Sequence, residues 1–256
     1  MENISIELLL YLAAGAALGG FVNGLSGFGT GLMSLGIWLQ VMQVGEAVPV
    51  VAAMSVISGL QSLWLTRHAV RTGLHRLPRF LFPALIGLPI GAWLLNWIDA
   101  THLKLSVAFF MLFYTAFFLL RGRLSQLFTR EHPFLDCLAG LFGGVMGGAA
   151  SLSGVIPTMW CALQPWDKFQ TSAVLRPYNV VILSLAFLWY LAAGHVSFTT
   201  WIYTAIALPV TLVFSRIGVA TFKKLTDDMF RNVLVGLMLL SAFSILAREL
   251  LPDQFL

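Results

Sequence analysis

Residues 15–38 are apolar enough to enter a lipid bilayer, but they contain too many glycines for a continuous helix. A glycine in a helix interior costs roughly 1 kcal/mol relative to alanine. The glycines of this stretch lie at positions 15, 19, 20, 24, 27, 29, 31 and 36. We therefore predict a break across Ser26-Gly27-Phe28-Gly29. Inside a bilayer, broken backbone is tolerated only where it is buried in protein or lines a cavity.

The second half of the chain repeats this stretch. Residues 140–160 read GLFGGVMGGAASLSGVIPTMW, and a shift of 124 positions aligns them with the first stretch. The aligned pairs are Gly19-Gly20 with Gly143-Gly144, Gly24 with Gly148, and Gly29-Thr30 with Ser153-Gly154. A weaker echo at an offset of 127 relates residues 91–94 to residues 218–221. Interrupted hydrophobic segments at matching places in two halves indicate the binding site of a transporter.

The remaining sequence supports a membrane protein. Only 10% of the 256 residues are charged and 59% are hydrophobic, whereas soluble domains are about 25% charged. Most of the chain must lie in lipid, and its long apolar segments predict an all-α integral membrane protein. The net charge of +4 does not indicate nucleic-acid binding, because most basic residues lie in loops between apolar spans. The expected partners are membrane lipids and a small substrate, not nucleic acid.

The apolar segments follow the same order in both halves. They are a broken pair at 8–42, spans at 47–66, 80–98 and 105–120, a second broken pair at 134–163, and spans at 171–193, 199–222 and 232–247. We predict two repeats, residues 1–125 and 126–256, each a Gly-rich broken helix pair plus three transmembrane helices. This gives about eight to ten spans. The pattern leaves open whether each broken pair forms two full spans or a re-entrant hairpin.

The basic loops predict the orientation of these spans. Lysine and arginine gather in the loops 67–79, 121–130 and 223–231, and such loops are normally cytoplasmic. With these loops inside, the first broken pair begins outside and the second begins inside. The two repeats are then inverted copies, and both termini lie in the periplasm.

Polar side chains within the two breaks predict a binding site. Each break would present a helix N-terminus, whose free N–H groups together with nearby hydroxyls favour an anion. The candidate residues of the two breaks are Asn23, Ser26, Gly29, Thr30, Gly148, Ser151 and Ser153. The alternative is close helix packing through small residues, since both stretches contain glycines four residues apart. Packing alone does not require a matched duplicate with polar residues, which favours the binding site.

Arg176 lies more than one turn inside a predicted span and is followed by Pro177, Tyr178 and Asn179. An ionisable residue within a membrane segment is costly and by default marks a functional site. Its planar guanidinium suits bidentate binding of an oxyanion. We therefore predict that Arg176, Tyr178 and Asn179 complete the substrate site. The alternative is that Arg176 extends along the lipid to the cytoplasmic headgroups.

The predicted spans lack the acidic and metal-binding residues that cation transport, metal binding and catalysis require. No Asp or Glu lies deep in a span, although cation carriers and proton relays usually place carboxylates there. The five histidines lie in loops or at span ends and lack metal-binding spacing, so we expect neither a metal nor a cofactor. No acid or base is placed to activate a serine, so an enzyme is not expected. A membrane-embedded transferase that uses His68 and His75 is the enzymatic alternative.

The duplicated motifs GGFVNGLSGFGTG and GGVMGGAASLSGVIP resemble those of the TauE/SafE sulfite exporter family. The resemblance also covers the length and the order of elements in each half. One departure is Pro157, whose counterpart in the first half is Met33. The resemblance implies a carrier in the bacterial inner membrane for sulfite or for small sulfonates and related organosulfur anions.

Taken together, these patterns predict a secondary transporter of small organosulfur anions that works by alternating access. Candidate substrates are sulfite, sulfoacetate, isethionate and taurine-like sulfonates. The alternatives are a passive anion channel and a carrier of another small, carboxylate-type anion. The coupling ion, a proton or sodium, stays open, and so does a homodimer.

Overall fold

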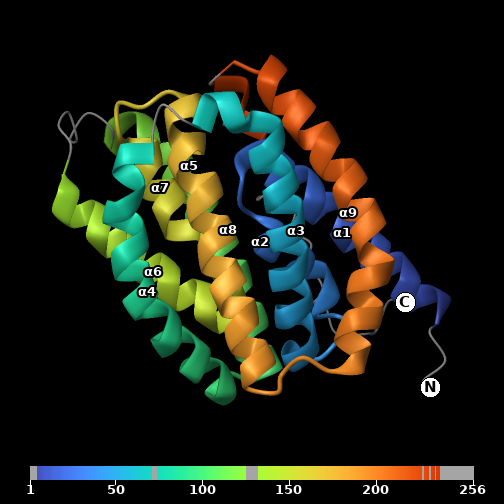
Figure 1. The fold of residues 1–256 in the computed structure, drawn as a ribbon. Helices are drawn as coiled ribbons and strands as arrows, with labels where there is room; N and C mark the ends of the chain where they lie inside the picture. Colours follow the sequence, from blue (N-terminus) through green and yellow to red (C-terminus); the bar gives the residue numbers. More distant parts are fainter. Residues whose placement is uncertain are drawn as a thin grey trace.

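The computed structural model describes residues 5–70, 74–124, 132–226, 228–230, 232–233 and 235–236. These residues form helices and no strand (Figure 1). The α-helices are α1 (Ile6–Ser26), α2 (Thr30–Trp38), α3 (Val44–Val70), α4 (Leu77–Leu94), α5 (Ala100–Leu124), α6 (Pro133–Ala150), α7 (Val155–Leu163), α8 (Lys168–Ala192) and α9 (Phe198–Lys224). Short 3₁₀ turns at Leu74–Arg76 and Leu95–Trp97 flank α4.

Six of the described helices are long and apolar enough to cross a membrane, namely α1, α3, α4, α6, α8 and α9. The prediction of an all-α membrane protein is thereby confirmed. Helix α5 contains a shorter apolar stretch, Thr101–Phe117. Most of the last predicted span, 232–247, lies outside the described residues.

Both predicted breaks are present. Helix α1 ends at Ser26 and α2 begins at Thr30, while α6 ends at Ala150 and α7 begins at Val155. Gly27 and Gly29 have φ angles of 83° and 96°, a region that side chains disfavour and glycine adopts easily. Gly27 N–H donates to Asn23 O at 2.7 Å and so closes the end of α1. The first break therefore depends on the backbone freedom of its glycines.

Each broken pair is a long helix followed by a short helix that returns along it. Helices α2 and α7 have nine residues each, or about 14 Å, roughly half of the hydrocarbon thickness. Ser34 Oγ donates to Gly15 O at 2.9 Å, and Trp38 Nε1 donates to Tyr11 O at 3.1 Å. Helices α2 and α7 are therefore too short to cross the bilayer alone, so neither pair consists of two full spans.

The fourth helix of each half packs against the first helix of the other half. Helix α9 lies along α1, and α4 lies along α6. The glycine contacts are Gly20 with Thr211 and Gly24 with Ser215 on one side, and Gly144 with Ala84 and Gly148 with Leu88 on the other. These two sets of contacts are related by the sequence offsets of 124 and 127. The duplication in the sequence is therefore also a duplication of packing.

The corresponding helices α3 and α8 meet at the centre and run in opposite directions (Figure 1). Two contacts show the direction: Gly59 packs on Val180, and Ser62 accepts from Arg176. As the residue number rises along α3, it falls along α8. The third helix of each half thus lies antiparallel to its counterpart.

Substituting Gly91 should destabilise the packing of α4 on α6. A Cβ at this position would lie 1.8 Å from Val145 O, a backbone atom that cannot rotate away. We expect Gly91→Ala to cost about 1–3 kcal/mol, as overpacking usually does, and to lower the thermal midpoint in detergent micelles. Gly45→Ala is the matched control, because a Cβ there meets nothing within 4 Å. Equal midpoints for the two variants would contradict the close approach.

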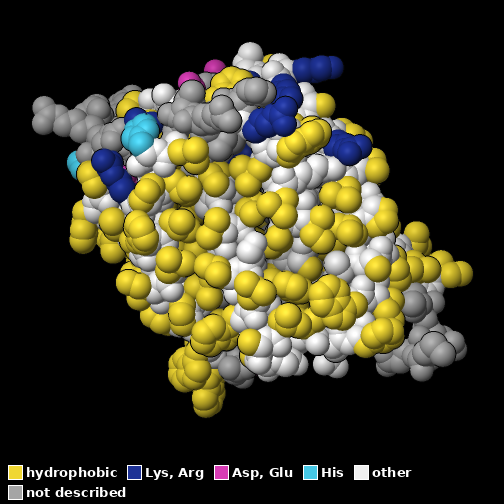
Figure 2. Space-filling model, in the orientation of Figure 1, with side chains coloured by type: hydrophobic (Ala, Val, Ile, Leu, Met, Phe, Trp, Pro, Cys, Tyr) yellow, Lys and Arg dark blue, Asp and Glu magenta, His cyan; other side chains and the backbone are white. Residues whose placement is uncertain are grey.

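The surface has the distribution of a multi-pass membrane protein. Figure 2 shows a hydrophobic body, with lysine and arginine gathered along one edge. This edge holds the C-terminal ends of α3 and α9, where Arg67, Lys223 and Lys224 lie. Away from this basic edge, the helices carry large exposed apolar side chains such as Trp93 and Phe214. Such a surface is stable in lipid, with its basic edge at the headgroups.

Candidate functional site

A small cavity lies where the two breaks meet, with a volume of about 10 Å³, close to the space that one water molecule needs. Its lining comes from both halves: Phe28, Gly29, Gly31, Leu32 and Ser55 from the first, and Ser151, Leu152, Gly154, Val155, Asn179 and Leu183 from the second. The cavity is therefore formed only when the two halves are packed together.

The N-termini of both short helices face this cavity. Gly29 and Gly154 are the N-cap residues of α2 and α7, and both line it. The first N–H groups of a helix have no partner within the helix, and together they carry about half a positive charge. Neither N-cap residue forms a side-chain capping bond. At the start of α7, Val155 N–H donates to Leu152 O at 3.4 Å. The other first N–H groups of the two helices converge from opposite halves, an arrangement that suits an anion.

Three polar side chains line the cavity beside these backbone donors. Ser55 is 1% exposed, and its Oγ has no hydrogen-bond partner. Ser151 Oγ donates to Val48 O at 3.1 Å. Asn179 Oδ1 accepts from Ser153 Oγ at 2.5 Å, which leaves the amide nitrogen of Asn179 as the donor for the cavity. The buried Ser55 hydroxyl, which has no hydrogen-bond partner, is the group in the cavity that most clearly could bind a ligand.

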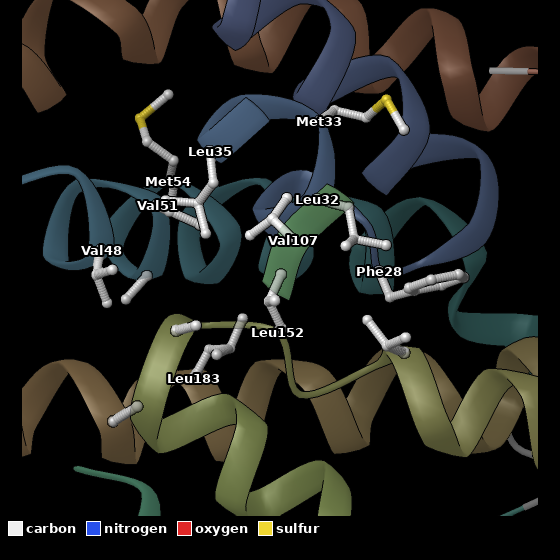
Figure 3. Close-up of a cluster of buried hydrophobic side chains, with 14 of the residues drawn as sticks. Phe28, Leu32, Met33, Leu35, Val48, Val51, Met54, Val107, Leu152 and Leu183 are labelled. Carbon is white, nitrogen blue, oxygen red and sulfur yellow. The ribbon is translucent and has the colours of Figure 1, made fainter. Parts of the chain in front are cut away.

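Apolar side chains close the remaining walls. Figure 3 shows Leu152, from the second break, pointing towards Leu32 and Val107, with Leu183 beside it. Phe28 of the first break is almost fully buried, and its ring contacts Tyr114 of α5 at a centroid distance of 6.0 Å. The cavity thus combines a few polar donors with an apolar wall, as ligand sites usually do.

Three of the predicted site residues, Gly29, Ser151 and Asn179, line the cavity. Ser153 does not line the cavity, but its hydroxyl donates to Asn179 Oδ1 and so fixes the orientation of the Asn179 amide. Thr30 opens α2 directly beside the cavity, and its Oγ1 has no hydrogen-bond partner.

The structure gives four other predicted residues structural contacts outside the cavity lining. Asn23 Nδ2 donates to Ser58 Oγ at 2.6 Å. Ser26 Oγ lies 2.8 Å from Val22 O in α1 and 2.8 Å from Phe28 O within the first break, and it donates to one of them at a time. Gly148 packs on α4, and Tyr178 donates to Gly140 O at 3.0 Å. For these positions the contacts match the alternative of helix packing and hold the breaks in place.

Arg176 is 1% exposed and caps the end of α1. Its Nη2 donates to the carbonyls of Gly24 and Leu25 at 3.0 and 3.1 Å. The other guanidinium nitrogens donate to the hydroxyls of Ser62 and Ser172. Arg176 does not extend to the headgroups, and it does not line the cavity. It therefore places a full positive charge behind the first break.

Ser55 is a cavity residue that the sequence patterns did not single out. Moving Ser55 by the repeat offset of 124 gives Asn179, and moving Phe28 by the same offset gives Leu152. All four residues line the cavity. The offset, applied to Asn179, would have identified Ser55.

No carboxylate lines the cavity in the part of the chain that the structure describes. In the same part, no three His, Cys, Asp or Glu side chains lie close enough together to hold a metal ion. The chemistry available there is hydrogen-bond donation and positive potential.

A family model described as "Sulfite exporter TauE/SafE" matches residues 11–245. The match includes both breaks, α8 with Arg176 and Asn179, and all three basic loops. The comparison with curated proteins and the comparison with solved structures found no match.

Proposed function

Because the chain belongs to the sulfite exporter TauE/SafE family, we propose that it is a secondary transporter of small organosulfur anions such as sulfite and short sulfonates. Members of this family are membrane transporters and not enzymes. The family relationship implies an anion exporter of the membrane. The finer proposal concerns the substrate, its site and the mechanism.

The observation that carries the proposal is the meeting of two helix N-termini around an unpartnered hydroxyl. The oxygens of a sulfonate or sulfite would accept from the N–H groups at the starts of α2 and α7, and from Ser55 and Asn179. In a cavity of low dielectric constant, such donors act more strongly than in water. Arg176 supports this binding through its charge and makes no direct contact.

The proposed mechanism is alternating access between two inverted halves. It is supported by the antiparallel course of α3 and α8 and by the matched contacts of α1 with α9 and of α4 with α6. In such transporters two repeats rock about a site at the centre of the bilayer. In this proposal the protein lies in the inner membrane, with loops 67–79, 121–130 and 223–231 in the cytoplasm and both termini in the periplasm.

Thermal stability of the purified protein against a ligand panel tests the proposed substrate class. The panel holds sulfite, isethionate, sulfoacetate, taurine, sulfate, acetate and a neutral sugar. A ligand that binds the folded state stabilises it by about 2.7 kcal/mol at a concentration of 100 times Kd. We expect sulfur monoanions to raise the midpoint and the sugar to leave it unchanged. A shift of the midpoint by the sugar would contradict the proposal. So would the absence of a shift with every anion.

Ser55→Ala should weaken anion binding without unfolding the protein. A hydrogen bond to a charged group contributes about 1.5–3 kcal/mol, which corresponds to an affinity loss of roughly 10-fold to 150-fold. The loss is measured as the change in Kd from isethionate titrations of the thermal midpoint. Ser215→Ala is the matched control, because Ser215 is also buried and unpartnered but does not line the cavity. Equal affinities in the two variants would remove Ser55 from the site.

Saturable counterflow in proteoliposomes distinguishes the carrier from the passive channel. The cavity between the breaks is small and lies between packed apolar side chains, which supports a carrier that binds one substrate at a time. A conductance far above carrier turnover would support the channel.

A further inference from the structure

Helix α3 carries a buried line of hydroxyl side chains that starts at the cavity. Its members are Ser55, Ser58, Ser62 and Thr66, which follow one another at intervals of three or four residues and therefore share one face of the helix. All four residues are buried, with at most 5% of their surface exposed. The line runs about 16 Å from the cavity towards the basic edge at the end of α3. We call it the hydroxyl stripe.

Helix packing alone does not explain these hydroxyls. The repeat offset of 124 relates Ser58 to Ile182 and Ser62 to Ala186, both on the corresponding helix α8. Ile182 and Ala186 are fully buried, as Ser58 and Ser62 are. The matching face of α8 thus packs with apolar side chains where α3 has polar ones. The hydroxyls of α3 are therefore not a requirement of the packing.

Side chains from two other helices cover the stripe. Asn23 Nδ2 of α1 donates to Ser58 Oγ at 2.6 Å, and Arg176 of α8 donates to Ser62 Oγ. Asn23 Oδ1 and Ser55 Oγ have no hydrogen-bond partner, although both residues are buried. Buried polar atoms normally have a partner, so these two atoms point to a ligand or to water that accompanies it.

Arg176 is a buried cation beside the stripe. Its recorded hydrogen bonds all go to neutral oxygens, and it forms no ion pair within the described part of the chain. A buried charge without a counter-charge is costly, and ionisable residues inside membrane proteins commonly mark a substrate pathway. An anion that passes Ser62 supplies the missing negative charge.

Two further cations lie close to Arg176. Lys168 Nζ and Arg176 Cζ lie 5.3 and 5.1 Å from the centre of the same Phe222 ring. Arg216 Nε donates at 3.0 Å to the amide oxygen of Gln61, which lies in α3 beside the stripe. Neither of these two cations forms an ion pair with a residue that the structure describes. Positive charge thus gathers around the outer part of the stripe, and such a field attracts anions.

We propose that the transported anion moves between the cavity and the basic edge along the hydroxyl stripe. This route rests on the proposed function, and it adds Asn23, Ser58 and Ser62 as residues that the anion passes. The hydroxyls of Ser58 and Thr66 donate to carbonyls of their own helix at 2.7 Å, and they can rotate towards the anion. The contacts of Asn23 with Ser58 and of Arg176 with Ser62 close the route in this conformation.

Cysteine accessibility in proteoliposomes tests the route. Cys137 and Cys161 are first replaced by alanine, and Ser58→Cys, Ser62→Cys and Ser215→Cys are each introduced into this background. The reagent is a small methanethiosulfonate that carries a sulfonate group, present on both sides of the membrane, and labelling is followed by mass. Ser215→Cys is the matched control, because Ser215 is a buried serine without a partner whose backbone packs on Gly24, away from the stripe.

We expect the two stripe cysteines to react at least about tenfold faster than the control, because only a thiol that water reaches forms the reactive thiolate. Saturating isethionate should slow the reaction at Ser58→Cys and Ser62→Cys and leave that at Ser215→Cys unchanged. If either stripe variant loses its thermal midpoint, Thr66→Cys at the outer end of the stripe takes its place.

The outcomes separate the route from the proposed function. Equal rates at the stripe and control positions, or stripe rates that isethionate does not change, would overturn the route. The isethionate-dependent shift of the thermal midpoint is measured in the same background. If that shift is present without labelling of the stripe, the route alone fails. If the shift is absent as well, the proposed function fails with it.

Discussion

Asn179→Asp is expected to abolish anion binding while the protein stays folded. The two side chains have nearly the same shape, and an aspartate can still accept from Ser153 Oγ, as Asn179 does at 2.5 Å. The substitution replaces a donor in the cavity by a negative charge. Two like charges about 4 Å apart repel by about 4 kcal/mol at an effective dielectric constant of 20, which corresponds to a loss of affinity on the order of a thousandfold.

The measurement is the isethionate-dependent shift of the thermal midpoint. Gln40→Glu is the matched control, because it makes the same amide-to-carboxylate change after the end of α2, where the Gln40 amide donates to Gly36 O and lies outside the cavity. We expect the control to retain binding. Retained binding in Asn179→Asp would show that the anion does not occupy this cavity.

Arg176→Met is expected to cause the largest loss of stability of any single substitution proposed for this protein. The change leaves the carbonyls of Gly24 and Leu25 and the hydroxyls of Ser62 and Ser172 without their donor in a buried position. Each unsatisfied buried group costs about 1–3 kcal/mol. We expect the thermal midpoint in micelles to fall on the order of 10 °C.

Two further variants make this result interpretable. Arg67→Met removes an exposed arginine and should change stability by less than about 0.5 kcal/mol. Arg176→Lys keeps the charge but has no planar fork, so it should recover part of the lost stability. A wild-type midpoint in Arg176→Met together with lost anion binding would show that Arg176 contacts the substrate directly.

The breaks could be predicted from the sequence because their cause is local. Glycine density sets the cost of a continuous helix, and the left-handed Gly27 and Gly29 occupy the predicted position. The all-helical membrane class followed from composition and segment length. The sequence did not decide whether each broken pair forms two full spans. The length of the second helix of each pair depends on where its apolar run meets a partner helix, and that contact lies far away in the sequence.

The direction of buried side chains could not be predicted. The sequence gives the depth of Arg176 in α8, but the side of the helix it occupies depends on where α1 ends, 150 residues earlier. Ser55 lies on an ordinary apolar helix, and no local pattern distinguishes it from Ser58 or Ser62. The packing of the two halves places Ser55 and Asn179 on the wall of the same cavity. In the sequence, only the repeat offset relates the two residues.

The exchange of helices between the halves has a consequence for biosynthesis. Helix α1 is made before its packing partner α9, which begins at Phe198. Until α9 has been made, the glycine face of α1, with Gly20 and Gly24, is left without the backbone that covers it. Contacts so distant in sequence form late. The glycine face of α1 therefore stays without its packing partner until α9 has been made.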